Sequence, residues 1–204
     1  MISIVNYGMG NLGSIVNMFK HIGVPCQISD DIQLLKKADK LLLPGVGAFD
    51  AAMSRIQRIP GLLDALREKA LIEKKPMLGI CLGMQLLTDQ SEEGEGQLTG
   101  LGFIPGKTLR FPASGELKVP HMGWNLVKEV QLSPLTAHLP EESRFYFVHS
   151  YYVQVIDPAH CIMSTTYGIT FDSVIQNENI FGAQFHPEKS HKFGMQVLKN
   201  FASV

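Results

Sequence analysis

Wholly apolar runs alternate with longer amphipathic stretches in the first half of the chain, and this alternation restricts the folds that the chain can adopt. Residues 41–43 and 77–80 carry no polar side chain. Strands of this kind need cover on both faces, as central strands of a parallel sheet do. The amphipathic stretches near residues 12–22 and 48–74 are long enough to be crossover helices. The pattern predicts an α/β fold with an open, mainly parallel central sheet flanked by helices.

The second half of the chain has a different residue pattern, which predicts β-hairpins added to that sheet. Gly and Pro punctuate short segments there, and some of these, such as 145–155, are rich in aromatic and β-branched side chains. An apolar run at 180–185 and an amphipathic stretch near 192–202 predict a last strand and a last helix. No linker, repeat or low-complexity tract divides the sequence, so we predict a single domain over residues 1–204.

Composition and charge argue against several classes of function. The formal net charge is −1 and no dense Lys/Arg stripe is present, so we expect no nucleic-acid partner. No apolar run approaches the roughly 18 residues that span a bilayer, and the first residues do not resemble a signal peptide. We therefore expect no membrane association and a cytoplasmic protein. Cys26, Cys81 and Cys161 are widely scattered, which argues against a disulfide framework or a zinc site. We predict neither a metal nor a cofactor.

Three glycines after the first predicted strand have the spacing of a dinucleotide-binding turn. Gly8, Gly10 and Gly13 follow an apolar run, and Asp30 and Asp31 lie about where a ribose-binding acid would be expected. Glycines are needed equally where a strand turns tightly into a helix that packs against it. On spacing alone, a nucleotide site and a structural turn both remain open.

The run Gly79-Ile80-Cys81-Leu82-Gly83 has the pattern of a nucleophile elbow. Such an elbow is a sharp turn from strand to helix, and it needs small residues two positions either side of the nucleophile. The N-terminus of the following helix would favour a thiolate at Cys81. The alternative is a small buried cysteine that only fills the core.

A candidate base and orienting acid lie at the end of the last predicted strand. His186 and Glu188 are two residues apart, so in an extended segment both would face the nucleophile. Pro187 favours an extended conformation at His186. A buried, purely structural histidine is the alternative, which the adjacent acid makes less favoured.

The glycine-rich segment at 43–49 follows another predicted strand and leads into a helix. Its backbone N–H groups are candidates for one half of an oxyanion hole, and the amide of Leu82 is a candidate for the other half. A structural turn is the alternative. A phosphate cradle is disfavoured because no Lys-Ser/Thr pair follows the glycines.

Three motifs, GICLGMQLL, PGVG and FHPEKS, together resemble the class I glutamine amidotransferases, whose catalytic order is Cys and then His-x-Glu. YGMGNLGSI, VPHMGWN and FYFVHSYY extend the resemblance to the amidotransferase subunits of imidazole glycerol phosphate synthases, almost from end to end. The first and second of these motifs argue against the subunits that serve anthranilate, aminodeoxychorismate or pyridoxal phosphate synthesis. The motifs explain the neighbouring strand ends without a nucleotide, so the turn becomes the favoured interpretation of the first glycines.

The resemblance implies a role for each matching position. It implies the catalytic residues Cys81, His186 and Glu188, and oxyanion donors in the backbone of Gly47 and Leu82. It implies the glutamine-binding positions Gly45, Gln85, Glu93, Ser150 and Tyr151. It implies that a partner binds at Tyr7, Asn11, Trp124 and Lys189.

The resemblance also implies a reaction and a partner. L-glutamine would be hydrolysed to glutamate and ammonia through a thioester, without a cofactor. The ammonia would pass to a separate (β/α)₈-barrel cyclase subunit that forms imidazole glycerol phosphate in histidine biosynthesis, the two subunits forming a heterodimer. Two other hypotheses remain: a cysteine hydrolase that acts alone, and an interaction subunit without catalytic activity.

Overall fold

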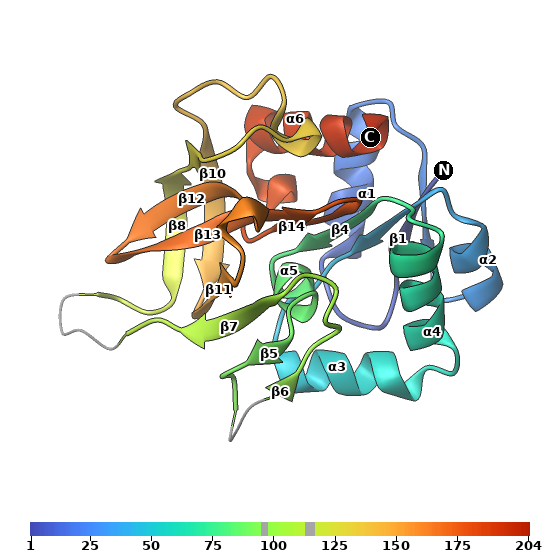
Figure 1. Cartoon of the computed structure of the whole chain (residues 1–204). Helices are drawn as coiled ribbons and strands as arrows, with labels where there is room; N and C mark the ends of the chain where they lie inside the picture. Colours follow the sequence, from blue (N-terminus) through green and yellow to red (C-terminus); the bar gives the residue numbers. More distant parts are fainter. Residues whose placement is uncertain (95–97, 113–116) are drawn as a thin grey trace.

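The computed structural model describes residues 1–94, 98–112 and 117–204, and a large mixed sheet forms its centre (Figure 1). One half of this sheet is entirely parallel, as the consecutive apolar runs predicted. Its strands, in spatial order, are β2 (Cys26–Ser29), β1 (Ile2–Val5), β3 (Lys40–Leu43), β4 (Met77–Ile80) and β14 (Ile180–Ala183).

Helices cover both faces of the parallel half, and the alternation of side chains along each strand sends them into two separate cores. Ile4 of β1 packs into the core that contains Phe19 and Phe201, whereas its neighbour Val5 packs into the core that contains Phe49. The first core lies under α1 (Leu12–His21) and α6 (His191–Ser203). The second lies under α2 (Ile32–Lys37), α3 (Phe49–Arg58), α4 (Leu62–Arg67) and α5 (Leu82–Leu86).

Mostly antiparallel strands, with one parallel pair among them, continue the sheet beyond β14, so the fold is the open sheet with added hairpins that the sequence predicted. In order they are β13 (Ile169–Asn177), β11 (Tyr151–Val155), β7 (Gly106–Arg110), β5 (Gln90–Ser91) and β6 (Leu98–Thr99), with β12 (Cys161–Tyr167) and β9 (Lys128–Glu129) branching from β13. A separate two-stranded sheet is formed by β8 (His121–Leu126) and β10 (Arg144–His149). The described residues also form 3₁₀ turns at Pro134–Thr136, Pro158–His160 and Pro187–Lys189.

The structure differs from the sequence-based predictions at three places. The helix predicted over residues 48–74 is divided, because Gly61 adopts a left-handed conformation (φ 79°) after Pro60, and it ends in a π-helical turn, Glu68–Ile72. The short helix α2 was not predicted; its N-cap is Asp31, whose side chain accepts hydrogen bonds from two backbone amides. The run at 145–155 forms two strands, and these belong to different sheets.

The loops after β1, β3, β4 and β14 meet at one edge of the parallel half. In the first of these loops Gly8 and Gly10 have positive φ angles of 81° and 109°, and the Arg55 side chain donates a hydrogen bond to the Gly8 carbonyl oxygen at 2.7 Å. A Cβ atom on Gly8 would collide with that guanidinium group. The glycines therefore make a tight turn packed against α3, as the turn interpretation predicted. None of the described helices is both long enough and apolar enough to cross a membrane.

Candidate active site

Cys81 occupies a strained turn between β4 and α5. Its φ and ψ angles are 53° and −111°, a region that residues with a Cβ atom rarely adopt. Gly79 and Gly83 make the turn possible: a Cβ atom on Gly79 would lie 2.5 Å from the Gly83 carbonyl oxygen, and one on Gly83 would overlap the Leu43 carbonyl oxygen. The arrangement has the form of a nucleophile elbow, since the thiol is presented above the end of the strand.

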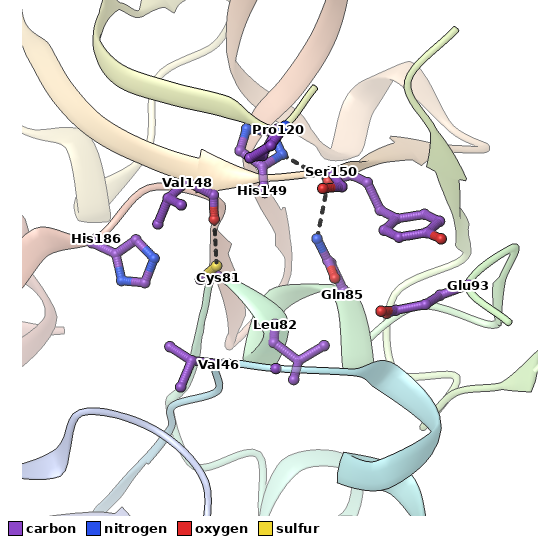
Figure 2. Close-up of a pocket in the computed structure, with 12 residues that line it drawn as sticks. Val46, Cys81, Leu82, Gln85, Glu93, Pro120, Val148, His149, Ser150 and His186 are labelled. Atoms are coloured by element: carbon purple, nitrogen blue, oxygen red, sulfur yellow. Dashed lines mark hydrogen bonds between the residues drawn. The ribbon is translucent and has the colours of Figure 1, made fainter. Parts of the chain in front are cut away.

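The thiol lies at the wall of a cavity of about 340 Å³. The backbone N–H of Cys81 donates to the Ala183 carbonyl oxygen at 2.8 Å, which ties the elbow to β14. The sulfur accepts from the side-chain amide of Gln184 at 3.7 Å. It lies 4.0 Å from the Val148 carbonyl oxygen, the contact drawn in Figure 2. Leu82 is the first residue of α5, so its N–H has no acceptor within the helix.

His186 follows β14 and points toward Cys81 in Figure 2. Its Nδ1 lies 2.9 Å from Oε1 of Glu188, and both side chains are 2% exposed. His186 itself is extended, with φ −100° and ψ 97°, as expected before Pro187. The residues after it are not, because Pro187–Lys189 forms a 3₁₀ turn, and this turn still brings the carboxylate to the imidazole. Burial alone would lower the pKa of His186, and interactions with Cys81 and Glu188 outweigh that effect and raise it to about 9.

The loop after β3 forms one wall of the cavity, across from Val148 and His149 in Figure 2. Val46 and Gly47 line the cavity, and Gly47 has a φ angle of 107°. Gly45 does not line it, because this residue is buried against the start of α5. The Tyr7 hydroxyl donates to the Pro44 carbonyl oxygen at 2.6 Å. Tyr7 is 3% exposed, so its side chain supports this loop from inside, which does not fit the predicted role at a partner surface.

The far end of the cavity is lined by four of the predicted glutamine-binding positions, Gln85, Glu93, Ser150 and Tyr151. Oε2 of Glu93 accepts a hydrogen bond from the Phe49 N–H at 2.9 Å, so this carboxylate also caps the N-terminus of α3. Partial burial raises the pKa of Glu93 above its ordinary value. The cavity thus has a thiol and an imidazole at one end and a carboxylate at the other.

Residues 3–204 match the family model described as glutamine amidotransferase class-I. The chain is a class I glutamine amidotransferase. A protein of Methanococcus maripaludis named imidazole glycerol phosphate synthase subunit HisH 2 is 54% identical to it over 98% of both chains. A protein of the same name from Pseudomonas aeruginosa is 47% identical over the whole of both chains.

Solved structures agree with this amidotransferase in fold. One titled crystal structure of glutamine amidotransferase has a TM-score of 0.76 at 15% identity, covering the whole of both chains. A glutamine amidotransferase from Thermotoga maritima has a TM-score of 0.64 at 17% identity, covering 99% of this chain and 82% of that one. These likenesses extend to the fold and no further.

A single carbonyl oxygen determines how the polar groups of the amidotransferase cavity are oriented. The Tyr151 carbonyl accepts from Nε2 of Gln85 at 3.1 Å and from Nδ1 of His149 at 2.7 Å. A carbonyl oxygen can only accept, so both nitrogen atoms must carry hydrogen. Nε2 of Gln85 therefore also donates to Oε1 of Gln184, 3.2 Å away, and the amide nitrogen of Gln184 is left facing the Cys81 sulfur.

The same argument determines which ring nitrogen donates and which accepts in two buried histidines behind the cavity. Because Nδ1 of His149 donates to Tyr151, its Nε2 is the acceptor for Nδ1 of His121, 3.0 Å away. Nε2 of His121 then accepts from the side-chain amide of Asn125 at 3.3 Å. Both imidazoles are neutral in this chain of hydrogen bonds. Burial lowers the pKa of His149 to about 3 and that of His121 to about 4.

Three of the four predicted partner-binding residues are exposed. Asn11 precedes α1, Trp124 is 47% exposed on β8, and Lys189 follows the site. Met122, Trp124 and Leu126 form an exposed apolar strip on β8, which we call the β8 strip. This strip adjoins the cavity, because Met122 pairs with Val148, one of the cavity-lining residues.

Gln184 and His121 are site residues that were not predicted from the sequence. Gln184 is fully buried at the end of an otherwise apolar run, and such a polar side chain signals a hydrogen-bonding role. His121 gave no comparable signal, because its partner His149 lies 28 residues away in the sequence.

Proposed function

We propose that this amidotransferase acts in the cytoplasm as the glutaminase component of an imidazole glycerol phosphate synthase. The observation that carries the proposal is the cavity in which the strained Cys81 faces the buried pair of His186 and Glu188. The names of the relatives, at 47% to 54% identity over essentially the whole chain, support the assignment to this synthase.

The first half of the proposed reaction is attack of the Cys81 thiolate on the side-chain amide carbon of glutamine. The carbonyl oxygen becomes an oxyanion and accepts hydrogen bonds from the backbone N–H groups of Gly47 and Leu82. When the carbon–nitrogen bond breaks, the His186 imidazolium gives its proton to the departing nitrogen, which leaves as ammonia. A γ-glutamyl thioester remains on Cys81. The raised pKa of His186 suits it to this role of acid.

The second half is hydrolysis of the thioester. Nε2 of His186, now neutral, accepts a proton from a water molecule that attacks the thioester carbon, and glutamate and the thiolate are released. Glu188 holds Nδ1–H of His186 throughout and stabilises the imidazolium each time that it forms. Glu93 pairs with the substrate ammonium group, while Gln85 and the Ser150–Tyr151 segment position the rest of the glutamine.

The ammonia must then be consumed at a second site, which we place on a (β/α)₈-barrel cyclase. The β8 strip, with Trp124, is an apolar surface beside the cavity that suits a docked partner. Trp124 stacks on His191 with a centroid distance of 5.4 Å, and Nζ of Lys189 lies 5.5 Å from the Tyr146 ring centroid. Asn11 would contribute to the same surface.

The test measures glutamate release from glutamine by the purified chain alone, and then with the cyclase and its nucleotide ligand. We expect release that the partner stimulates and that Cys81→Ala abolishes. Strong release without the partner would instead support a hydrolase that acts alone. No release and no thioester in any mixture would overturn the proposal in favour of a non-catalytic subunit.

A further inference from the structure

Gln184 is a buried polar side chain that joins the nucleophile to the substrate-binding end of the cavity. It has no exposed surface, and its two polar atoms contact Cys81 and Gln85. We propose that Gln184 is a positioning residue for the glutaminase reaction, whose amide N–H holds the Cys81 sulfur while its carbonyl oxygen holds Gln85. The inference rests on the proposed function, since it takes Cys81 as the nucleophile.

The direction of the Gln184 amide follows from its surroundings. If the amide were reversed, its nitrogen would face Nε2 of Gln85, and two donors would meet 3.2 Å apart. Gln85 cannot reverse to relieve this, because its Nε2 donates to the Tyr151 carbonyl oxygen. The sulfur of Cys81 therefore always faces an N–H group.

A donor that faces the sulfur favours the charged form of the nucleophile. A thiolate accepts the Gln184 N–H more strongly than a neutral thiol does, because the hydrogen bond is assisted by charge. The donor also fixes where the sulfur lies above α5. Gln184 thus supports the reactive state of Cys81 without titrating itself.

The same amide links the nucleophile to the substrate. The Gln184 side-chain carbonyl oxygen accepts a hydrogen bond from Nε2 of Gln85, and the Tyr151 carbonyl oxygen accepts a second one from the same nitrogen. With its nitrogen held in this way, Gln85 keeps its own carbonyl oxygen for the substrate. Removal of Gln184 should therefore change both the reactivity of the thiol and the KM for glutamine.

Other titratable groups lie around Cys81, and the test must leave them in place. They are His186, with Glu188 behind it, and Tyr7 from the loop after β1, and His149 from β10, which lines the same cavity. A substitution at Gln184 changes none of these side chains. A shift in the thiol profile of the uncharged variant Gln184→Met can therefore be assigned to the lost N–H.

The test compares Gln184→Met, which removes both polar atoms at similar length, with Gln184→Glu, which keeps an acceptor for Gln85. Alkylation of Cys81 by iodoacetamide is followed from pH 5 to 9 by peptide mass spectrometry, with Cys26 as an internal reference. We expect both variants to react about tenfold more slowly at pH 7, with the inflection moved to higher pH, because a hydrogen bond to a charged atom is lost. In Gln184→Glu the new carboxylate acts in the same direction, since it faces the thiolate with a like charge. The KM for glutamine should rise more in Gln184→Met than in Gln184→Glu.

Gln176→Met is the matched control, because Gln176 is bonded to Ser133 and to the Glu178 backbone, away from the cavity. Thermal unfolding verifies that each variant is folded. An unchanged alkylation profile in folded Gln184→Met and Gln184→Glu would overturn the inference, even if wild-type glutaminase activity supports the proposed function. Failure of the wild type to release glutamate with its partner would count against the proposed function instead.

Discussion

Glu188 is hydrogen-bonded to His186, and both side chains are almost fully buried. We predict that Glu188→Gln lowers kcat for glutamate release by about 10²- to 10⁴-fold, because the imidazolium loses its charged partner. The pKa of His186 should fall from about 9, so the alkaline limit of activity should move to lower pH. A pH–rate profile of the complex measures both effects. Glu178→Gln, at an exposed carboxylate paired with Lys74, is the control and should leave the profile unchanged.

His121 and His149 give the protein a predictable sensitivity to acid. Both are held neutral, with pKa values of about 4 and about 3, whereas in the unfolded chain a histidine titrates near pH 6.5. Between these values the unfolded chain binds more protons, so stability is complete above about pH 6.5 and falls as the pH drops toward 4. The loss is at most about 1.4 kcal/mol per pH unit for each histidine.

Chemical denaturation at several pH values from 7.5 to 4.5 measures this dependence. The double variant His121→Asn/His149→Gln should show a shallower loss of stability with acid than the wild type, although it starts from a lower value. His21→Gln, at an exposed histidine of α1, should keep the wild-type slope. Equal slopes in the wild type and the double variant would contradict the neutral pair.

At the scale of elements, the elbow depends on the close approach of α5 to the loop after β3. We predict that Gly83→Ala destabilises the protein by more than about 3 kcal/mol, because its Cβ would overlap a backbone carbonyl group that cannot move freely. Gly13→Ala in α1 should be neutral or stabilise by about 0.5 kcal/mol, since a Cβ there meets nothing within 4 Å and the helix gains propensity. Thermal unfolding of the two variants, or their soluble yield, separates these outcomes.

The elements show where sequence patterns are informative and where they fail. The parallel strands were predictable because a strand covered on both faces must be apolar at consecutive positions, as in residues 41–43. The division of the 145–155 run at Ser150 was not, because β-propensity says nothing about which sheet a strand joins. The 3₁₀ turn at Pro187–Lys189 was missed because Pro187 restricts the residue before it and not those after it.

The candidate site also combines features that could be predicted from the sequence with features that could not. The elbow glycines and the pair of His186 and Glu188 could be identified from local spacing, because each is a feature of a few consecutive residues. The chain of hydrogen bonds through Gln184 and His121 joins four separate segments, and no local pattern reports it.

At the scale of the whole molecule, the cavity lies where the parallel sheet meets the small β8–β10 sheet, next to the β8 strip. We predict that Met122→Asp weakens binding of the barrel cyclase at least tenfold, because a docked partner would have to desolvate the new carboxylate. Met122 is 62% exposed, so the free protein should unfold at an unchanged temperature. Isothermal titration calorimetry measures the affinity.

Leu132→Asp is the control for this surface, because Leu132 is 88% exposed and lies in the segment after β9. The control should bind the cyclase as tightly as the wild type. Equal affinities for Met122→Asp and the wild type would place the partner elsewhere on the molecule.

The Tyr151 carbonyl oxygen influences whether the effects of separate substitutions add up. Two branches of hydrogen bonds, one to Cys81 and one to Asn125, take their direction from this one acceptor. Substitutions at Gln184 and at His121, which lie on different branches, will therefore not have additive effects. An evolving lineage could therefore tolerate such changes in one order and not in the other, because the first substitution alters how strongly the second one affects the protein.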